Sequence, residues 1–154
     1  MASEFKIVRR VEFSDTDMAG IMHFSNFFRY METAEHAFFR SLGLSIHTRI
    51  GDQLISWPRV HVECKYLRPL RFEDEVEVHL ILREKRNRSL VYNFIFRKLG
   101  LSTSEIVAQG AMTTICAVCE PASGQMSAVP IPDEIGSLLE VAPPEMLEER
   151  EISL

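Results

Sequence analysis

Apolar residues recur along this chain at two different spacings, which predict one long helix and several strands. Between Phe24 and Leu42, large apolar side chains return every three or four residues, which is the spacing of one face of an α-helix. Gly43 follows this run and suits the left-handed conformation that often ends a helix. The pattern therefore predicts a single long helix over residues 24–42, with a largely apolar face.

Strands are predicted on either side of this helix, because apolar and polar residues alternate there with a two-residue period. The predicted strands cover residues 5–13, 60–66, 76–82, 90–97 and 105–118. Trp57-Pro58 stands before the second strand, which predicts a sheet edge or a bulge at its start. The last strand is apolar on both sides near its middle, so we expect it in the interior of the sheet.

This order of elements predicts an α+β domain in which the long helix packs on one antiparallel sheet. A loop is expected around Gly51-Asp52, and the basic segment 85–89 is expected to form a hairpin tip. After Pro121 the chain is expected to add a short helix at residues 133–139 and an acidic, frayed end. One free face and open edges of the sheet predict pairing with a second copy of the chain.

Length and composition narrow the class of protein. At 154 residues the chain is expected to form one domain, with a core at about 5–118 and a peripheral tail at 121–154. The net charge of -5 excludes a bulk basic surface for nucleic acid, so an anionic ligand requires a local basic cluster. The sequence shows neither a signal peptide nor an apolar stretch of membrane-spanning length. We expect a cytoplasmic protein with no membrane partner.

The cysteines and histidines do not predict a metal site. Cys64, Cys116 and Cys119 are odd in number without a secretion signal, so no disulfide framework is expected. Cys116 and Cys119 have the spacing of half a zinc motif, but three residues apart in a strand they point to opposite faces. Buried or half-buried thiols are expected instead. The four histidines at 36, 47, 61 and 79 lack companion ligands at metal-like spacing, which predicts structural or surface roles.

The densest polar chemistry lies between the first strand and the helix, in the segment Asp15-Thr16-Asp17-Met18-Ala19-Gly20-Ile21-Met22-His23. One interpretation is an EF-hand calcium loop, because Asp-x-Asp is followed by Gly20 at the required position. However, Ala19 and Asn26 stand where oxygen ligands belong. A second interpretation is that Asp15 and Asp17 cap the turn and the helix through backbone N–H groups. Base rates favour this capping role for Asp15.

A third interpretation of the same segment is catalytic. The unsatisfied N–H groups at a helix N-terminus can polarise a carbonyl group, while a nearby carboxylate attacks that carbonyl or activates water. A carboxylate beside the start of a largely apolar helix therefore has the two components that acyl transfer requires.

A resemblance to a known family favours the catalytic interpretation. The run Phe13-Ser14-Asp15-Thr16-Asp17-Met18-Ala19-Gly20-Ile21-Met22-His23-Phe24-Ser25-Asn26-Phe27, followed by Tyr30-Met31-Glu32-Thr33-Ala34, strongly resembles the signature of the 4-hydroxybenzoyl-CoA thioesterase family and its YbgC-like relatives. A weaker resemblance continues through Tyr66-Leu67-Arg68-Pro69-Leu70, Asp74 and the basic hairpin. The resemblance covers roughly residues 5–118. It implies a hotdog fold, in which a five-stranded antiparallel sheet wraps around a long central helix.

The resemblance also implies roles for individual residues. Asp17 corresponds to the family's catalytic carboxylate, and the oxyanion contact is a backbone N–H that falls near His23 or Phe24. Gly20 belongs to the same signature and is expected to contact substrate. Some members of the family have other residues at the positions of His23 and Phe24, which leaves the role of the His23 side chain open.

The basic hairpin corresponds to the family's site for the phosphates of CoA, here Arg86, Arg88 and Ser89. Two guanidinium groups and a hydroxyl at a hairpin tip can hold phosphate oxygens by charge-assisted hydrogen bonds. The alternative is a solvated charged turn. Glu32 matches an acidic position of the family's helix, where an ion pair or a subunit contact is as well supported as catalysis.

The expected function is hydrolysis of an acyl-CoA thioester to a free acid and CoA, without a metal or redox cofactor, by a homodimer or homotetramer. Asp17 can act as nucleophile or as general base, since both roles need the ionised carboxylate. One alternative is a hotdog hydratase or dehydratase, whose signature usually places a His five residues after an Asp, whereas His23 stands six after Asp17. Another is a non-catalytic acyl-CoA binding protein. An aromatic acyl group and a medium aliphatic chain are equally compatible with the sequence.

Overall fold

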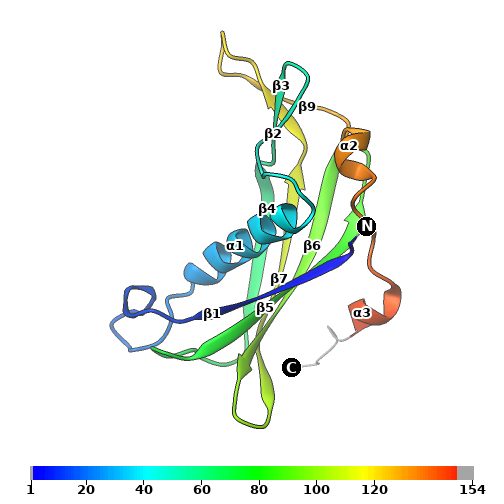
Figure 1. Cartoon of the computed structure of the whole chain (residues 1–154). Coiled ribbons are helices and arrows are strands. Elements are labelled where there is room, and N and C mark those ends of the chain that lie inside the picture. The colour runs from blue at the N-terminus through cyan, green and yellow to red at the C-terminus, as the bar shows by residue number, and fades with distance from the viewer. Residues whose placement is uncertain (1, 149–154) are drawn as a thin grey trace.

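The computed structural model describes residues 2–148, and its main feature is an antiparallel sheet wrapped around one long helix (Figure 1). The sheet has five strands in the order β1-β5-β6-β7-β4. Their bounds are β1 Glu4–Arg10, β4 Arg59–Tyr66, β5 Glu75–Lys85, β6 Ser89–Leu99 and β7 Ser104–Ile115. The helix α1, Asn26–Ser41, lies across one face of this sheet. The predicted five-stranded α+β architecture is confirmed.

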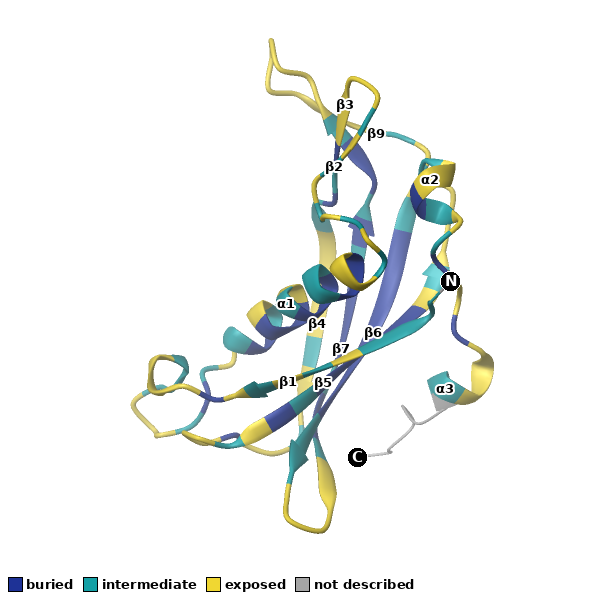
Figure 2. Cartoon of the chain, viewed as in Figure 1, coloured by how far each residue is buried: buried dark blue, intermediate teal, exposed yellow. Residues whose placement is uncertain are grey.

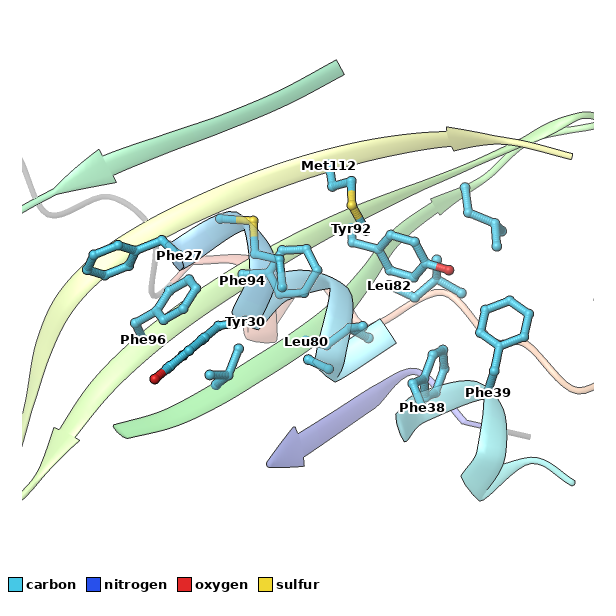
Figure 3. Close-up of a cluster of buried hydrophobic side chains, with 14 of the residues drawn as sticks. Phe27, Tyr30, Phe38, Phe39, Leu80, Leu82, Tyr92, Phe94, Phe96 and Met112 are labelled. Atoms are coloured by element: carbon cyan, nitrogen blue, oxygen red, sulfur yellow. The ribbon is translucent and has the colours of Figure 1, made fainter. Parts of the chain in front are cut away.

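The helix α1 packs on the sheet through an aromatic face (Figure 3). Phe27, Tyr30 and Phe38 are almost completely buried, at helical spacing, against side chains such as Phe94 and Phe96 of β6. Burial of each such aromatic side chain contributes about 2–3 kcal/mol through removal of apolar surface from water. The apolar period read from the sequence is therefore the inward face of the helix.

The start of α1 differs from the prediction, whereas the glycine cap after its end agrees with it. The helix begins at Asn26, two residues after Phe24, because the Asn26 side chain donates to the Asp15 carbonyl at 2.8 Å and holds the preceding residues in a loop. It ends at Ser41, and Gly43 adopts a φ of 78° as predicted for a left-handed cap.

The edge of the sheet and its interior follow the predictions. β4 is an edge strand, and its register against β7 shifts between Arg59 and His61, so Trp57-Pro58 precedes both an edge and a bulge. β7 lies between β6 and β4, which confirms its interior position.

One face of the sheet is less free than the sequence predicted. The tail covers part of it, because Ala142 and Met146 pack against Ile81 of β5 and Ile95 of β6. Figure 2 shows both strands buried along much of their length, on the helix side as well as beneath the tail. The Ala142 N–H also donates to the Leu82 carbonyl at 2.8 Å.

A second, smaller sheet was not predicted. It has the order β2-β3-β8-β9 and consists of β2 Thr48–Ile50, β3 Gln53–Ser56, β8 Ala117–Cys119 and β9 Met126–Ala128. The expected loop at Gly51-Asp52 is the turn between β2 and β3. The strand predicted to reach residue 118 breaks after Ile115, and residues 117–119 leave the main sheet to pair with β3 and β9. Consequently Cys119 is exposed, contrary to the prediction, whereas Cys64 is half-buried and Cys116 is buried.

The remaining boundaries also differ from the sequence patterns. β1 stops at Arg10, and a 3₁₀ turn, η1 (Phe13–Asp15), replaces the predicted end of the strand. The predicted C-terminal helix is present as α2, Asp133–Gly136, and a further short helix α3, Pro144–Glu148, follows it. The acidic end beyond residue 148 lies outside the described residues. In residues 2–148, no helix is both long and apolar enough to cross a membrane.

Candidate active site

The polar segment singled out in the sequence forms a loop, residues 15–24, that we call the reactive segment. It lies between η1 and α1 and is held against the residues that precede β5. The Met22 N–H donates to the Leu70 carbonyl at 2.7 Å, and Ile21 forms a β-bridge with Arg71. These bonds place the reactive segment at the end of the sheet where β5 begins.

Asp17 is half-buried in this loop, and its two carboxylate oxygens have different surroundings. Its Oδ1 accepts the Ala19 N–H at 2.8 Å and the Ile21 N–H at 3.4 Å. Gly20 has a φ of 79° and donates its N–H to the Asp17 carbonyl at 3.0 Å, a turn that favours glycine. Within residues 2–148, no hydrogen-bond donor contacts the second oxygen, Oδ2. The loop therefore fixes the carboxylate and leaves one oxygen available.

The two backbone N–H groups proposed for the oxyanion contact differ in availability. The His23 N–H donates to the Asp15 carbonyl at 2.8 Å, so that donor is occupied. The Phe24 N–H has no acceptor among the described residues. The His23 ring stacks on the Phe24 ring at 4.4 Å, and its Nδ1 lies 2.7 Å from the Ser25 hydroxyl. Of the two residues, Phe24 thus keeps the unpaired backbone donor.

A cavity of about 460 Å³ opens beside Asp17. Its lining residues are Asp17, Ile21, Met22, Phe24, Phe27, Tyr66, Leu67, Arg68, Pro69 and Leu70. Most of these side chains are apolar, and the Phe27 and Tyr66 rings meet edge to face at 5.0 Å. Arg68 is ion-paired with Glu105. An apolar cavity with one carboxylate on its wall suits the acyl part of a thioester.

No sequence pattern singled out Tyr66 or Phe27 individually as a site residue. Tyr66 ends a strand and Phe27 lies on the apolar face of a helix, so their patterns indicate ordinary strand and core positions. Tyr66 belongs to a weaker part of the family resemblance, which was the one available signal. Their place on the cavity wall depends on how β4 passes the start of α1, which is a property of the fold.

The predicted phosphate-binding hairpin lies away from Asp17. Arg86 and Arg88 follow β5, whereas the reactive segment contacts residues just before β5. β5 has 11 residues, a length of about 35 Å for an extended strand. Arg86 is exposed and ion-paired with Glu84 at 2.7 Å. Ser89 begins β6, and its carbonyl accepts the Arg86 N–H at 2.9 Å. One copy of the chain therefore does not bring the hairpin and Asp17 together.

Two other sequence-based interpretations are decided by contacts. Asp15 caps η1, because its Oδ2 accepts the Glu12 N–H at 2.9 Å, which confirms the capping role. Neither aspartate caps α1, which has no side-chain cap. Glu32 is ion-paired with Arg59 at 3.4 Å, as one interpretation predicted. Among residues 2–148, no group of three or more His, Cys, Asp or Glu side chains is arranged to hold a metal ion.

This fold and this site together define a hotdog-type hydrolase, and comparisons with known proteins agree. The model of the thioesterase-like superfamily matches residues 11–139. A protein of Aquifex aeolicus that is described as an esterase is 35% identical over 97 residues, which is 63% of this chain and 75% of the relative.

Solved structures show the same fold. A gentisyl-coenzyme A thioesterase superposes with a TM-score of 0.73 and 29% identity, over 86% of this chain and 99% of that one. The 4-hydroxybenzoyl CoA thioesterase of Pseudomonas sp. strain CBS-3 superposes with a TM-score of 0.78 and 20% identity, over 89% and 99% of the two chains. The predicted hotdog fold is confirmed. The chain belongs to the thioesterase-like superfamily and is a thioester hydrolase.

Proposed function

We propose that the protein hydrolyses acyl-CoA thioesters to a free acid and CoA at the cavity beside Asp17. The observation that carries this assignment is the position of two groups on one apolar cavity. Among the described residues, one oxygen of the Asp17 carboxylate has no hydrogen-bond partner, and the Phe24 N–H has no acceptor. In this proposal the thioester carbonyl oxygen accepts the Phe24 N–H, and the carbonyl carbon lies next to Asp17.

Two routes are chemically balanced at this site. The carboxylate attacks the carbonyl carbon, CoA leaves as a thiolate, and water then hydrolyses the mixed anhydride. Alternatively, the carboxylate takes a proton from water as the hydroxide attacks, and that proton passes to the departing sulfur. In both routes the C–S bond breaks and water supplies the OH of the acid. Neither requires a metal or redox cofactor, and a CoA substrate is in keeping with a cytoplasmic enzyme.

An aromatic acyl group is the preferred substrate in this proposal. Phe24, Phe27 and Tyr66 form an aromatic wall, and aromatic rings pack well in offset or edge-to-face contacts. The gentisyl-coenzyme A thioesterase with 29% identity is named for an aromatic acyl group. This similarity supports a ring over an aliphatic chain.

The proposed active unit is a pair of chains joined along β4. This edge strand exposes Val60, Val62 and Tyr66 by 56%, 42% and 43%, an apolar edge that favours pairing. The Tyr66 end of β4 lies beside the reactive segment, while the Arg59 end pairs with Thr114, which pairs with Leu90 next to the basic hairpin. Antiparallel pairing of two β4 strands therefore brings the hairpin of one copy toward Asp17 of the other.

The test is thiol release from a panel of benzoyl, hydroxybenzoyl and aliphatic acyl-CoA esters by the wild type and Asp17→Asn. We expect release from aromatic esters and a loss of about a hundredfold or more in kcat for Asp17→Asn, with the fold and assembly retained. Asp52→Asn is the matched control, because Asp52 is exposed in the turn between β2 and β3 and does not line the cavity. Turnover by Asp17→Asn near the wild-type rate contradicts the assignment. No release from any ester favours a hydratase or an acyl-CoA binding protein.

A further inference from the structure

Two tyrosine hydroxyls contact the reactive segment, one near each end. At its start, the Tyr30 hydroxyl donates to the Oδ2 of Asp15 at 2.7 Å. At its end, the Tyr66 hydroxyl donates to the Phe24 carbonyl at 2.9 Å. Tyr30 belongs to α1 and Tyr66 to the edge strand β4, so two separate elements of the fold hold one loop.

Tyr30 holds the loop through Asp15, which forms hydrogen bonds with several neighbouring residues. The Asp15 carboxylate accepts both the Tyr30 hydroxyl and the Glu12 N–H, while its carbonyl accepts the His23 N–H at 2.8 Å and the Asn26 side chain at 2.8 Å. The residues on both sides of Asp17 are thereby tied to one residue. Movement of Asp15 would displace the whole loop.

The surroundings of Tyr30 bury its ring and keep its hydroxyl protonated. The ring is 1% exposed, and the Arg9 guanidinium lies 4.1 Å above its centre while also donating to the Thr33 hydroxyl at 3.1 Å. Burial, together with the neighbouring Asp15 carboxylate, raises the pKa of the Tyr30 hydroxyl well above its usual value. The hydroxyl therefore stays protonated near neutral pH and donates to Asp15.

The Tyr66 contact fixes the residue that carries the free backbone donor. Its ring packs edge to face on Phe27 at 5.0 Å, and burial raises the pKa of its hydroxyl to about 12. Because the Phe24 carbonyl is held, the adjacent peptide plane and the Phe24 N–H have less rotational freedom. A donor that is oriented before the reaction stabilises a developing oxyanion without further reorganisation.

We propose that Tyr30 and Tyr66 are positioning residues, which hold Asp17 and the Phe24 N–H at the two ends of the reactive segment in the geometry that hydrolysis requires. This role rests on the proposed thioesterase activity. It assigns the hydroxyl groups to orientation, and it leaves the bond-making steps to Asp17 and water.

The chain offers matched variants for the test. Tyr30→Phe and Tyr66→Phe each remove one hydroxyl and keep the ring. Tyr92→Phe is the control, because the buried Tyr92 hydroxyl has no hydrogen-bond partner among the described residues. With the best CoA ester of the panel, we expect kcat to fall about tenfold for Tyr30→Phe and for Tyr66→Phe while KM changes less than about twofold. Tyr92→Phe keeps the wild-type kcat.

A second measurement separates orientation from activity. The exchange of the His23 amide hydrogen, followed by NMR, is expected to be about tenfold faster in Tyr30→Phe than in Tyr92→Phe, because its acceptor Asp15 is less firmly held. Wild-type kcat per folded molecule in both Tyr30→Phe and Tyr66→Phe, or unchanged exchange at His23, overturns the positioning role. If Asp17→Asn is as active as the wild type, the proposed function fails, and the exchange result still tests the contacts of Tyr30.

Discussion

Asp17 and Arg86 lie beyond opposite ends of β5, so a single copy of the chain separates the carboxylate from the basic hairpin by the length of a strand. The edge strand β4 runs from the hairpin end of the sheet to the Asp17 end and exposes apolar side chains. Antiparallel association of two such edges reverses one copy against the other. The proposed complete site therefore contains Asp17 of one copy and Arg86 of its partner.

Complementation between two variants that each lack a different part of the site tests this shared site. A dimer of two Asp17→Asn copies contains no complete site, and neither does a dimer of two Arg86→Ala copies. In a mixed dimer, one site combines the intact Asp17 of one copy with the intact Arg86 of the other. At low substrate concentration, an equal mixture that has been allowed to exchange subunits is expected to regain about a quarter of the wild-type activity, since about half the dimers are mixed. Recovery that stays at the sum of the two separate variants contradicts sharing between copies.

The basic hairpin is expected to act on the CoA part of the substrate. Arg86→Ala should raise KM for a CoA ester several-fold, and leave KM for a truncated thioester without the nucleotide unchanged, because remote phosphate contacts contribute binding energy. Glu84→Gln is a control in which KM should change in the opposite direction. Glu84 neutralises Arg86 at 2.7 Å, so its removal should lower KM for the CoA ester. Equal changes with both substrates would show that the hairpin does not bind phosphate.

The Phe24 N–H is expected to be the oxyanion donor. Phe24→Pro removes this N–H, and kcat should fall about a hundredfold or more, as it does when a donor to a developing oxyanion is lost. Phe24→Ala keeps the backbone donor and removes the exposed ring, so it should retain most of kcat and change chiefly KM. Circular dichroism and the thermal midpoint verify that both variants are folded. Similar kcat values for the two variants would exclude a special role of this N–H.

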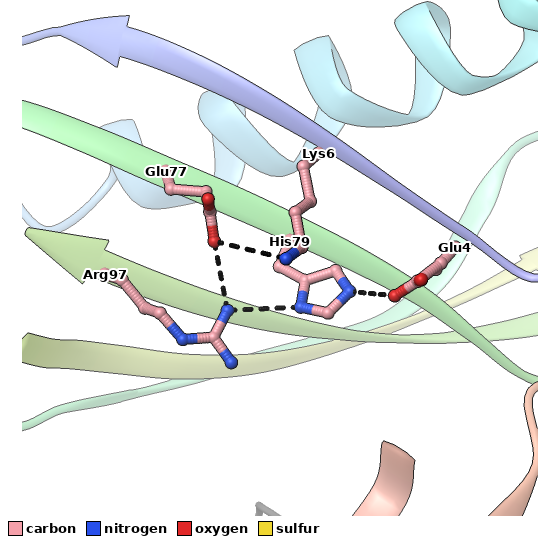
Figure 4. A network of polar contacts seen from close by, with 5 residues as sticks. All are labelled: Glu4, Lys6, Glu77, His79 and Arg97. Carbon is pink, nitrogen blue, oxygen red and sulfur yellow. Dashed lines mark hydrogen bonds and ion pairs between the residues drawn. The ribbon is translucent and has the colours of Figure 1, made fainter. Parts of the chain in front are cut away.

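Stability is expected to decrease in acid because of His79, which is buried on the outer face of the sheet (Figure 4). Burial lowers the pKa of His79 below its usual value, and nearby Lys6 and Arg97 act in the same direction, whereas Glu4 raises it. Arg97 donates to the ring Nδ1 at 3.1 Å and also pairs with Glu77, so the neutral ring fits this network.

The unfolded chain protonates this histidine at a higher pH than the folded chain does, so the free energy of unfolding falls as the pH drops below about 6.5. Thermal midpoints between about pH 7.5 and about pH 5.5 check this expectation. His79→Gln should show a smaller fall than the wild type over this range. His47→Gln, at an exposed position just before β2, is the matched control and should behave as the wild type. An equal fall in the wild type and His79→Gln contradicts the assignment.

The fold class and the central chemistry could be predicted because they depend on local patterns. The helical period between Phe24 and Leu42 reports the face that α1 buries, and alternation in the five strands reports the two faces of the sheet. The left-handed conformation of Gly43 and the capping role of Asp15 could be predicted, because a few neighbouring residues determine a helix end or a turn. The signature around Asp17 likewise lies within one continuous segment, and it indicated both the family and the reactive loop.

Other features depend on residues that are far apart in the sequence. The break after Ile115 lets residues 117–119 pair with β3 and β9, which creates the second sheet that no local period predicted. The cavity wall needs Tyr66 beside Phe27, which the passage of β4 past the start of α1 brings about. The sequence by itself predicted the long helix, the five strands of the main sheet and Asp17 as the candidate carboxylate. Strand order and packing decided which distant groups meet Asp17, and they left Arg86 at the far end of the sheet.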